Sequence, residues 1–199
     1  EQAGVLIAQG TRIDAVKIGI VGSAANAQVI ADIIAQLRLC DAELPVVLDP
    51  VLASGHGDLL TKGDAVQALA PLRKLATLLT PNLPAARALC GSDHVDAQAA
   101  ALLCDAPHVL IKGGHGDGDV IVNVLFSCDA ERRWRWPRLS EEYHGSGCTL
   151  ASAIAARLAH GMAMNDAVDR AQRYTQHCLE QAFAIADGQS IPDRIKEII

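Results

Sequence analysis

Short, continuously apolar segments alternate with helix-forming segments along this chain, and this alternation constrains the fold more than any other feature. Strands are expected over residues 15–21, 45–49, 76–80 and 108–112. Helices are expected over residues 24–39, 62–75 (with a break at Pro71), from the turn at 81–84 to Cys90, and 97–104. Strands that are apolar on both faces are buried on both faces, which is typical of a parallel sheet with helices on each side. The pattern therefore predicts an α/β fold with a mostly parallel central sheet.

The later part of the chain has a different pattern. Two extended stretches, 120–126 and 132–136, are expected to form a hairpin-like addition at one edge of the sheet. Two helices should follow, over residues 148–160 and 166–186. There is no internal repeat and no low-complexity linker, so we expect residues 1–199 to form a single domain.

Composition excludes several classes of function. The net charge of −6 argues against a general nucleic-acid or membrane-surface role. No apolar run approaches the length of a membrane span, and the first residues do not resemble a secretory signal. The six cysteines have no metal-binding spacing, which favours reduced thiols of a cytoplasmic protein, most of them core residues; they are Cys40, Cys90, Cys104, Cys128, Cys148 and Cys178.

Residues 132–138 (RRWRWPR) mix basic and aromatic side chains, as proteins that bind single-stranded nucleic acid do. The strict alternation from Arg133 to Trp136 instead favours an edge strand with tryptophan inside and arginine outside. In an acidic chain we prefer the edge strand, and we expect no nucleic-acid partner.

Polar, glycine-rich residues follow the expected strands. In sheets of this kind, ligands bind beyond the carboxyl ends of the strands. The segments predicted to lie there are Gly22–Ser23, Asp49–Val51, Thr80–Asn82, Lys112–His115 and His144–Cys148. Their composition suits phosphate binding.

The segment His144-Gly-Ser-Gly-Cys148 leads into an expected helix. Free N–H groups at a helix start bind anions, and the same partial positive charge would favour the thiolate form of Cys148. A tight turn with a buried, inert cysteine explains the local pattern equally well. Asp49 could hold Mg²⁺ or simply start a turn. Lys112 could meet phosphate oxygens or extend into solvent.

Four motifs in one order carry a resemblance to a known family. They are Val46-Val-Leu-Asp-Pro-Val51, Leu79-Thr-Pro-Asn-Leu-Pro84, Val109-Leu-Ile-Lys-Gly-Gly-His115 and His144-Gly-Ser-Gly-Cys-Thr149. This set closely resembles the hydroxymethylpyrimidine/phosphomethylpyrimidine kinases of thiamine biosynthesis, within the ribokinase-like superfamily. The resemblance implies a three-layer αβα sandwich and ATP- and Mg²⁺-dependent phosphorylation of a pyrimidine hydroxymethyl group, then of the resulting monophosphate. It also implies a small-molecule pyrimidine partner and allows a homodimer.

The same resemblance implies roles for individual residues. Gly145, Ser146 and Gly147 would form the anion hole, and Cys148 would be the general base, where sugar kinases of the superfamily use aspartate. Asp49 would lie near the phosphates and metal. The remaining nucleotide contacts would come from Asn82, Lys112, Gly114 and Thr149, and Ile20 and Val51 would flank the pyrimidine. Pyridoxal kinases, which are relatives within the superfamily, share the cysteine, so phosphorylation of pyridoxal is the alternative activity.

The sequence departs from the family pattern in two places. The family usually has a glutamate after Asn-Leu-Pro that helps to hold Mg²⁺ through water, but position 85 is Ala and position 87 is Arg. The family also has a strand, a glycine-rich substrate loop and a small lid or dimer-forming segment before the stretch that matches Ala15. From these departures we expect either a fragment of a kinase or a degenerate kinase, and a non-catalytic nucleotide-binding domain is the alternative from another functional class.

Overall fold

The computed structural model of the chain describes residues 2–52 and 64–195. Its centre is a six-stranded sheet in the order β1-β2-β3-β4-β5-β6. The strands are β1 (Val16–Ile18), β2 (Val46–Leu48), β3 (Leu78–Leu79), β4 (His108–Ile111), β5 (Val120–Phe126) and β6 (Glu131–Pro137). Strands β1 to β4 are parallel, and β5 and β6 join as an antiparallel hairpin. The predicted parallel sheet and its hairpin at one edge are both confirmed.

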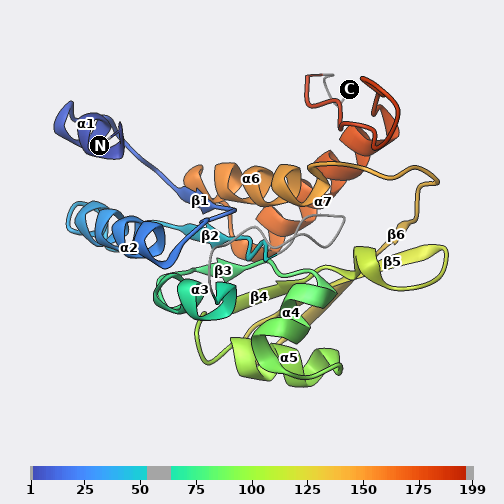
Figure 1. Cartoon of the computed structure of the whole chain (residues 1–199), viewed down its shortest axis with the longest axis horizontal. Helices are drawn as coiled ribbons and strands as arrows, with labels where there is room; N and C mark the ends of the chain where they lie inside the picture. The colour runs from blue at the N-terminus through green and yellow to red at the C-terminus, as the bar shows by residue number, and fades with distance from the viewer. Residues whose placement is uncertain (1, 53–63, 196–199) are drawn as a thin grey trace.

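Helices cover both faces of this sheet, as Figure 1 shows. One face carries α2 (Ala24–Arg38), α3 (Ala65–Arg73), α4 (Leu83–Cys90) and α5 (Val95–Leu102), and the other carries α6 (Ser146–Ala159) and α7 (Met164–Glu180). Side chains alternate between the faces along a strand. Val109 and Ile111 accordingly pack toward α2–α5, while Leu110 packs toward α6 and α7. The three-layer αβα prediction is confirmed.

The edge hairpin has the predicted side-chain arrangement. Trp134 is buried and Trp136 is half-buried, while Arg133 and Arg135 are exposed. The Trp134 Nε1 donates a hydrogen bond to Asp169 Oδ1 at 2.7 Å, which ties β6 to α7. The alternation of residues 132–136 therefore reflects an edge strand packed on a helix.

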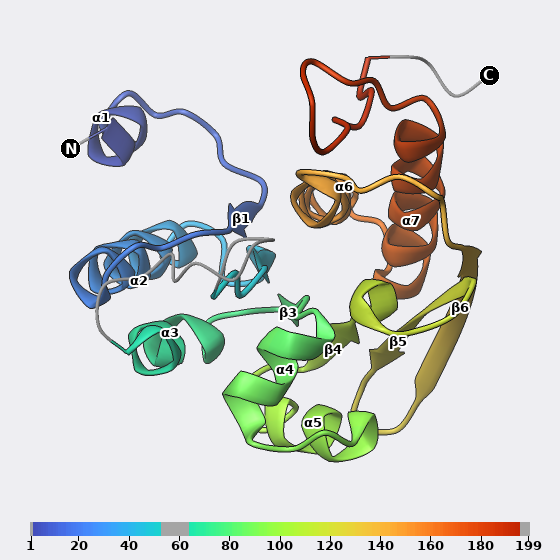
Figure 2. The same ribbon diagram turned by 45° about the vertical axis from the view of Figure 1, so that its right-hand side comes forward.

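Several predicted boundaries were wrong. Helix α3 continues through Pro71 to Arg73: the proline removes one helical hydrogen bond, and burial of Leu69 and Leu72 on either side of it offsets that loss. Residues 62 and 63 lie outside the described residues. Helix α7 ends at Glu180 rather than 186, and the chain then folds back so that Phe183 and Ile191 pair as a bridge. Helix α1 (Gln2–Ala8) was not predicted, and it lies away from the sheet with no buried residue (Figure 2).

The expectation that most cysteines are core residues was also wrong. Only Cys178 is buried and Cys90 is half-buried, whereas the other four are exposed. All six are free thiols. Within the described part of the chain, no helix is long and apolar enough to cross a membrane.

Candidate active site

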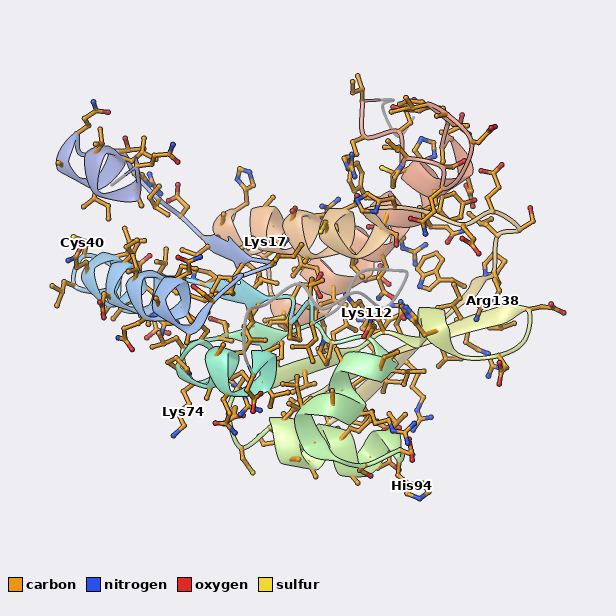
Figure 3. The ribbon with its side chains drawn as sticks, viewed as in Figure 1. Lys17, Cys40, Lys74, His94, Lys112 and Arg138 are labelled. Atoms are coloured by element: carbon orange, nitrogen blue, oxygen red, sulfur yellow. The ribbon has the colours of Figure 1, made fainter. Side chains whose placement is uncertain are left out.

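Two charged side chains meet beyond the carboxyl ends of the parallel strands. Asp49 follows β2 and Lys112 follows β4. The Asp49 N–H donates to the Ile18 carbonyl and the Lys112 N–H donates to the Pro81 carbonyl, both at 2.9 Å, so the neighbouring strand segments hold both residues. The Lys112 Nζ donates to Asp49 Oδ1 at 2.8 Å, and the two side chains are only 13% and 6% exposed. Lys112 therefore does not extend into solvent, and Figure 3 shows it near the centre of the molecule.

The start of α6 supplies unpaired N–H groups. Gly145 precedes the helix in the left-handed region, with φ of 85°, a conformation that favours glycine. The Thr149 hydroxyl donates to the Gly145 carbonyl at 2.8 Å and fixes this first turn. The first N–H groups of a helix have no partner within it and carry partial positive charge. Ser146, Gly147 and Cys148 form this first turn, so the anion-binding role predicted from the motif is geometrically available to them.

This helix start and the charged pair are in contact. A Cβ placed on Gly147 would lie 3.1 Å from Lys112 Nζ and 3.4 Å from Asp49 Oδ2. Glycine therefore lets the turn approach the pair closely. The segment at 144–148 was expected to follow a strand directly, and this expectation was wrong: residues 138–145 separate α6 from β6, and Tyr143 forms only an isolated bridge with Ser190.

Cys148 is exposed, which removes one of the two explanations that the sequence left open. A buried, inert cysteine is excluded. The thiol lines an open cavity of ≈ 500 Å³ between α6, α7 and the C-terminal segment, together with Arg157, Tyr174 and Arg194. It is therefore accessible to a small molecule.

The glycine-rich loop after Lys112 forms a short 3-10 helix, η1 (Gly113–His115), and is held by Arg138. Arg138 donates to the carbonyls of Gly114, Gly116 and Gly118 at 2.8, 2.6 and 2.6 Å. Desolvation, followed by the charges of Lys112 and Arg138, lowers the pKa of His115 below its ordinary value. The loop is thus braced in one conformation within a positive field.

The side-chain amides of Asn123 and Gln172 form a hydrogen-bonded network that holds the first residue of the same loop. The Asn123 Oδ1 accepts from the Gly113 N–H at 2.9 Å, and its Nδ2 donates to Gln172 Oε1 at 2.8 Å. The Trp136 Nε1 donates to the same Gln172 oxygen at 3.0 Å. Strand β5 and helix α7 therefore fix where the loop begins.

The remaining predicted residues lie in the segments beyond the strands and on the glycine-rich loop. Asn82 forms a bridge with Lys112, and its Oδ1 accepts from the Ala85 N–H at 2.8 Å as the N-cap of α4. Gly114 is exposed on the loop. Ile20, beyond β1, is 58% exposed, and Val51, beyond β2, is half-buried.

The donor set limits how a metal could bind. Across residues 2–52 and 64–195, no group of three His, Cys, Asp or Glu side chains could hold a metal ion. Ala85 is buried in α4 and offers no carboxylate. Asp49 keeps one oxygen, Oδ2, that Lys112 does not bond, and this oxygen faces Gly147. Because Mg²⁺ commonly binds through one or two carboxylates plus substrate phosphates, the residues fit an ion held chiefly by a nucleotide.

Sequence reasoning missed three residues of this site: Arg138, Asn123 and Arg194. Arg138 was considered only as the end of the basic and aromatic run. Asn123 interrupts an apolar strand, and a polar residue there was a signal for a buried hydrogen-bonding role. Arg194 lies 45 positions from its partner Thr149, so no local pattern indicated it.

Comparison with known proteins identifies the family. The phosphomethylpyrimidine kinase family matches residues 1–193. The chain belongs to this family. It is 40% identical over 179 residues to the hydroxymethylpyrimidine/phosphomethylpyrimidine kinase of Mycobacterium tuberculosis, an alignment that covers 84% of this chain and 64% of that protein. The kinase of the same name from Streptomyces coelicolor is 37% identical, covering 88% of this chain and 66% of that protein. The chain thus spans a little under two thirds of these relatives.

Solved structures of this family and of pyridoxal kinases share the fold. Phosphomethylpyrimidine kinase from Clostridium difficile has a TM-score of 0.74 and 30% identity, covering 89% of this chain and 74% of that chain. Pyridoxal kinase from Staphylococcus aureus in complex with AMP-PCP has a TM-score of 0.84 and 25% identity, covering 97% and 72%. The ribokinase-like fold expected from the four motifs is therefore confirmed.

Proposed function

We propose that the protein phosphorylates 4-amino-5-hydroxymethyl-2-methylpyrimidine, and then its monophosphate, with ATP in thiamine biosynthesis. One observation carries this proposal: the contact between the anion-binding turn at Gly145–Cys148 and the buried Asp49–Lys112 pair. It brings together the N–H groups of a helix start, a lysine cation and an accessible thiol. Membership of the phosphomethylpyrimidine kinase family supplies the substrate class.

In this proposal each residue has a distinct task. The N–H groups of the first α6 turn hold the transferring phosphoryl group, and Lys112 balances its charge. The Cys148 thiolate accepts the proton of the substrate hydroxyl. The hydroxyl oxygen then forms the new bond to phosphorus, and the bond between the γ-phosphorus and the bridging oxygen breaks, so that ADP leaves with that electron pair.

The other predicted site residues would bind the nucleotide and the metal ion. Asn82, Gly114 and Thr149 would help to position ATP, and Asp49 Oδ2 would contribute to holding Mg²⁺. A bound Mg²⁺ neutralises negative charge on the phosphates. Ile20 and Val51, in the segments beyond β1 and β2, would flank the pyrimidine ring; the exposed Ile20 is available for such a contact.

Replacing Cys148 tests the proposal. The Cys148→Ala variant should lose at least about 100-fold in turnover, the contribution expected of a general base. Because the thiol is exposed, thermal unfolding should be nearly unchanged. Turnover would be measured as ADP formation that depends on hydroxymethylpyrimidine. Near-wild-type turnover in the variant would refute the role of Cys148.

Two other functions have specific support. Pyridoxal kinases among the solved structures share the fold with TM-scores up to 0.84, which motivates pyridoxal as an acceptor. Competition between pyridoxal and hydroxymethylpyrimidine for the same enzyme separates these substrates. The missing carboxylate at Ala85 motivates a non-catalytic nucleotide-binding domain. Calorimetric titration with Mg·ATP beside the turnover assay identifies that case as binding without turnover.

A further inference from the structure

Arg194 lies against the first turn of α6, although it comes from the segment that follows α7. Its Nε donates to Thr149 Oγ1 at 2.9 Å. A Cβ placed on Gly145 would lie 2.9 Å from Arg194 Nη2. The guanidinium group therefore lies beside the same turn that Lys112 approaches at Gly147.

The backbone around Arg194 is held in place by α7. The Tyr174 hydroxyl donates to the Arg194 carbonyl at 3.1 Å, and the Asp193 N–H donates to the Cys178 carbonyl at 3.0 Å. These bonds fix the segment before any ligand binds. Little conformational entropy would then be lost when the guanidinium group meets an anion.

The charge arrangement points to such an anion. The N-terminal end of a helix carries partial positive charge, so a cation beside it is unfavourable on its own. Lys112 has Asp49 as its counter-ion, but no carboxylate in the described residues lies within 4 Å of the Arg194 guanidinium group. Arg194 is also exposed, and it lines the cavity that Cys148 lines. A phosphate between the helix start and Arg194 would remove this unfavourable arrangement.

We propose that Arg194 is a phosphate-binding residue of this site, supplied by the C-terminal segment. The inference rests on the proposed function, because it assigns a further ligand contact to the same helix start. Of the five N–H donors of arginine, the bond to Thr149 occupies one, which leaves a fork suited to two phosphate oxygens. The phosphate belongs either to the nucleotide or to the monophosphate acceptor, and both offer the same oxygens.

A structural role is the competing explanation, in which Arg194 only stabilises the first turn through Thr149. Arg157 provides a matched control because it lines the same cavity, yet it lies about three turns beyond Ser146, where α6 begins. Its Nη1 donates to the Ala153 carbonyl at 3.1 Å and its guanidinium group lies over the Tyr174 ring. Removing its charge should therefore not affect the helix start.

The experiment compares Arg194→Gln, Arg194→Lys and Arg157→Gln in the full chain by calorimetry. The probes are AMP-PCP with Mg²⁺ and, separately, hydroxymethylpyrimidine monophosphate. Loss of a charged hydrogen bond should weaken binding of at least one probe by roughly tenfold or more in Arg194→Gln. Arg194→Lys should recover part of this affinity, and Arg157→Gln should bind as the wild type does. Whichever probe is affected identifies the phosphate.

The outcomes separate this inference from the proposed function. If the wild type binds the probes and Arg194→Gln binds both equally well, Arg194 is not a phosphate ligand, while the kinase proposal stands. If Arg194→Gln loses thermal stability without ligand and Arg194→Lys recovers no affinity, the role is structural and the inference is wrong. If the wild type binds neither probe, the proposed function fails and the inference fails with it.

Discussion

Removing the charge of Lys112 should destabilise the protein, because it leaves the Asp49 carboxylate buried without its counter-ion. The two groups are 2.8 Å apart, and Asp49 has a side chain only 6% exposed. Breaking a fully buried ion pair costs about 3–5 kcal/mol. Because 13% of the Lys112 side chain reaches solvent, we take the lower end of that range, about 3 kcal/mol, for Lys112→Met. For a protein of this size the melting temperature should fall by roughly 6–12 °C.

Removing both charges should restore most of this loss. In Asp49→Asn/Lys112→Met neither charge is left in the interior, and replacing a buried pair by neutral groups is often nearly neutral. We expect the double variant to lie within about 1.5 kcal/mol of the wild type. The double variant should then be at least about 1.5 kcal/mol more stable than Lys112→Met. Both variants should lack turnover, because each has lost the cation beside Gly147.

Urea unfolding followed by circular dichroism measures the free energies, and the same preparations are assayed for ADP formation. The slope of free energy against urea concentration should not change, since the fold is kept. Two results would refute the reasoning: a Lys112→Met variant as stable as the wild type, or a double variant no more stable than the single one. Either would mean that the pair does not balance a buried charge. Full turnover in Lys112→Met would exclude the phosphate role of that lysine.

Three further predictions test other parts of the site. Iodoacetamide should modify both Cys148 and Cys128, because both thiols are exposed. AMP-PCP with Mg²⁺ should protect only Cys148 of these two, which peptide mass spectrometry would measure. Equal protection of both cysteines would contradict a ligand bound at the start of α6. Arg138→Ala removes three hydrogen bonds to the glycine loop and should raise the KM for ATP by roughly tenfold with a smaller change in kcat; an unchanged KM would separate the loop from the nucleotide. Because the pKa of His115 is lowered in the folded protein, the unfolded chain binds its proton more readily, so stability should fall as pH decreases through about 6.5. In His115→Asn, the free energy of unfolding by urea should differ less between pH 7 and pH 5 than in the wild type. An equal difference in the two proteins would show that His115 does not cause the fall.

The sheet could be predicted because its signals are local. Each parallel strand is a short apolar run, and residues such as Val109, Leu110 and Ile111 are buried whichever face they point to. The edge hairpin could be predicted because alternation in 132–136 needs only neighbouring residues. The end of α7 could not, because the segment after Glu180 forms its bonds with Ile191 rather than continuing the helix. The end of α7 therefore depends on a contact between distant residues, which the helical periodicity of the sequence does not reveal.

The candidate site could be predicted only where a single motif carries the chemistry. The turn at Gly145–Cys148 and the strand-end residues Asp49 and Lys112 were identified, because glycines and charges after apolar runs have a direct physical meaning. Whether Cys148 was buried remained open, since helical periodicity alone did not assign its face. Arg138 and Arg194 act across 20 or more positions, through backbone carbonyls and a hydroxyl that carry no distinctive sequence signal.

Gly147 explains why these separate signals amount to one site. Any side chain at this position would begin 3.1 Å from Lys112 Nζ, so the lysine would have to move away from the helix start or from Asp49. The glycine thereby keeps the first turn of α6 and the ion pair close together, as the proposed binding of one phosphate by both requires. In the sequence this residue is only one of two glycines around a serine, and its necessity follows from a side chain 35 positions earlier. The chemistry of the turn therefore depends less on its own residues than on how closely the sheet brings Lys112 to it.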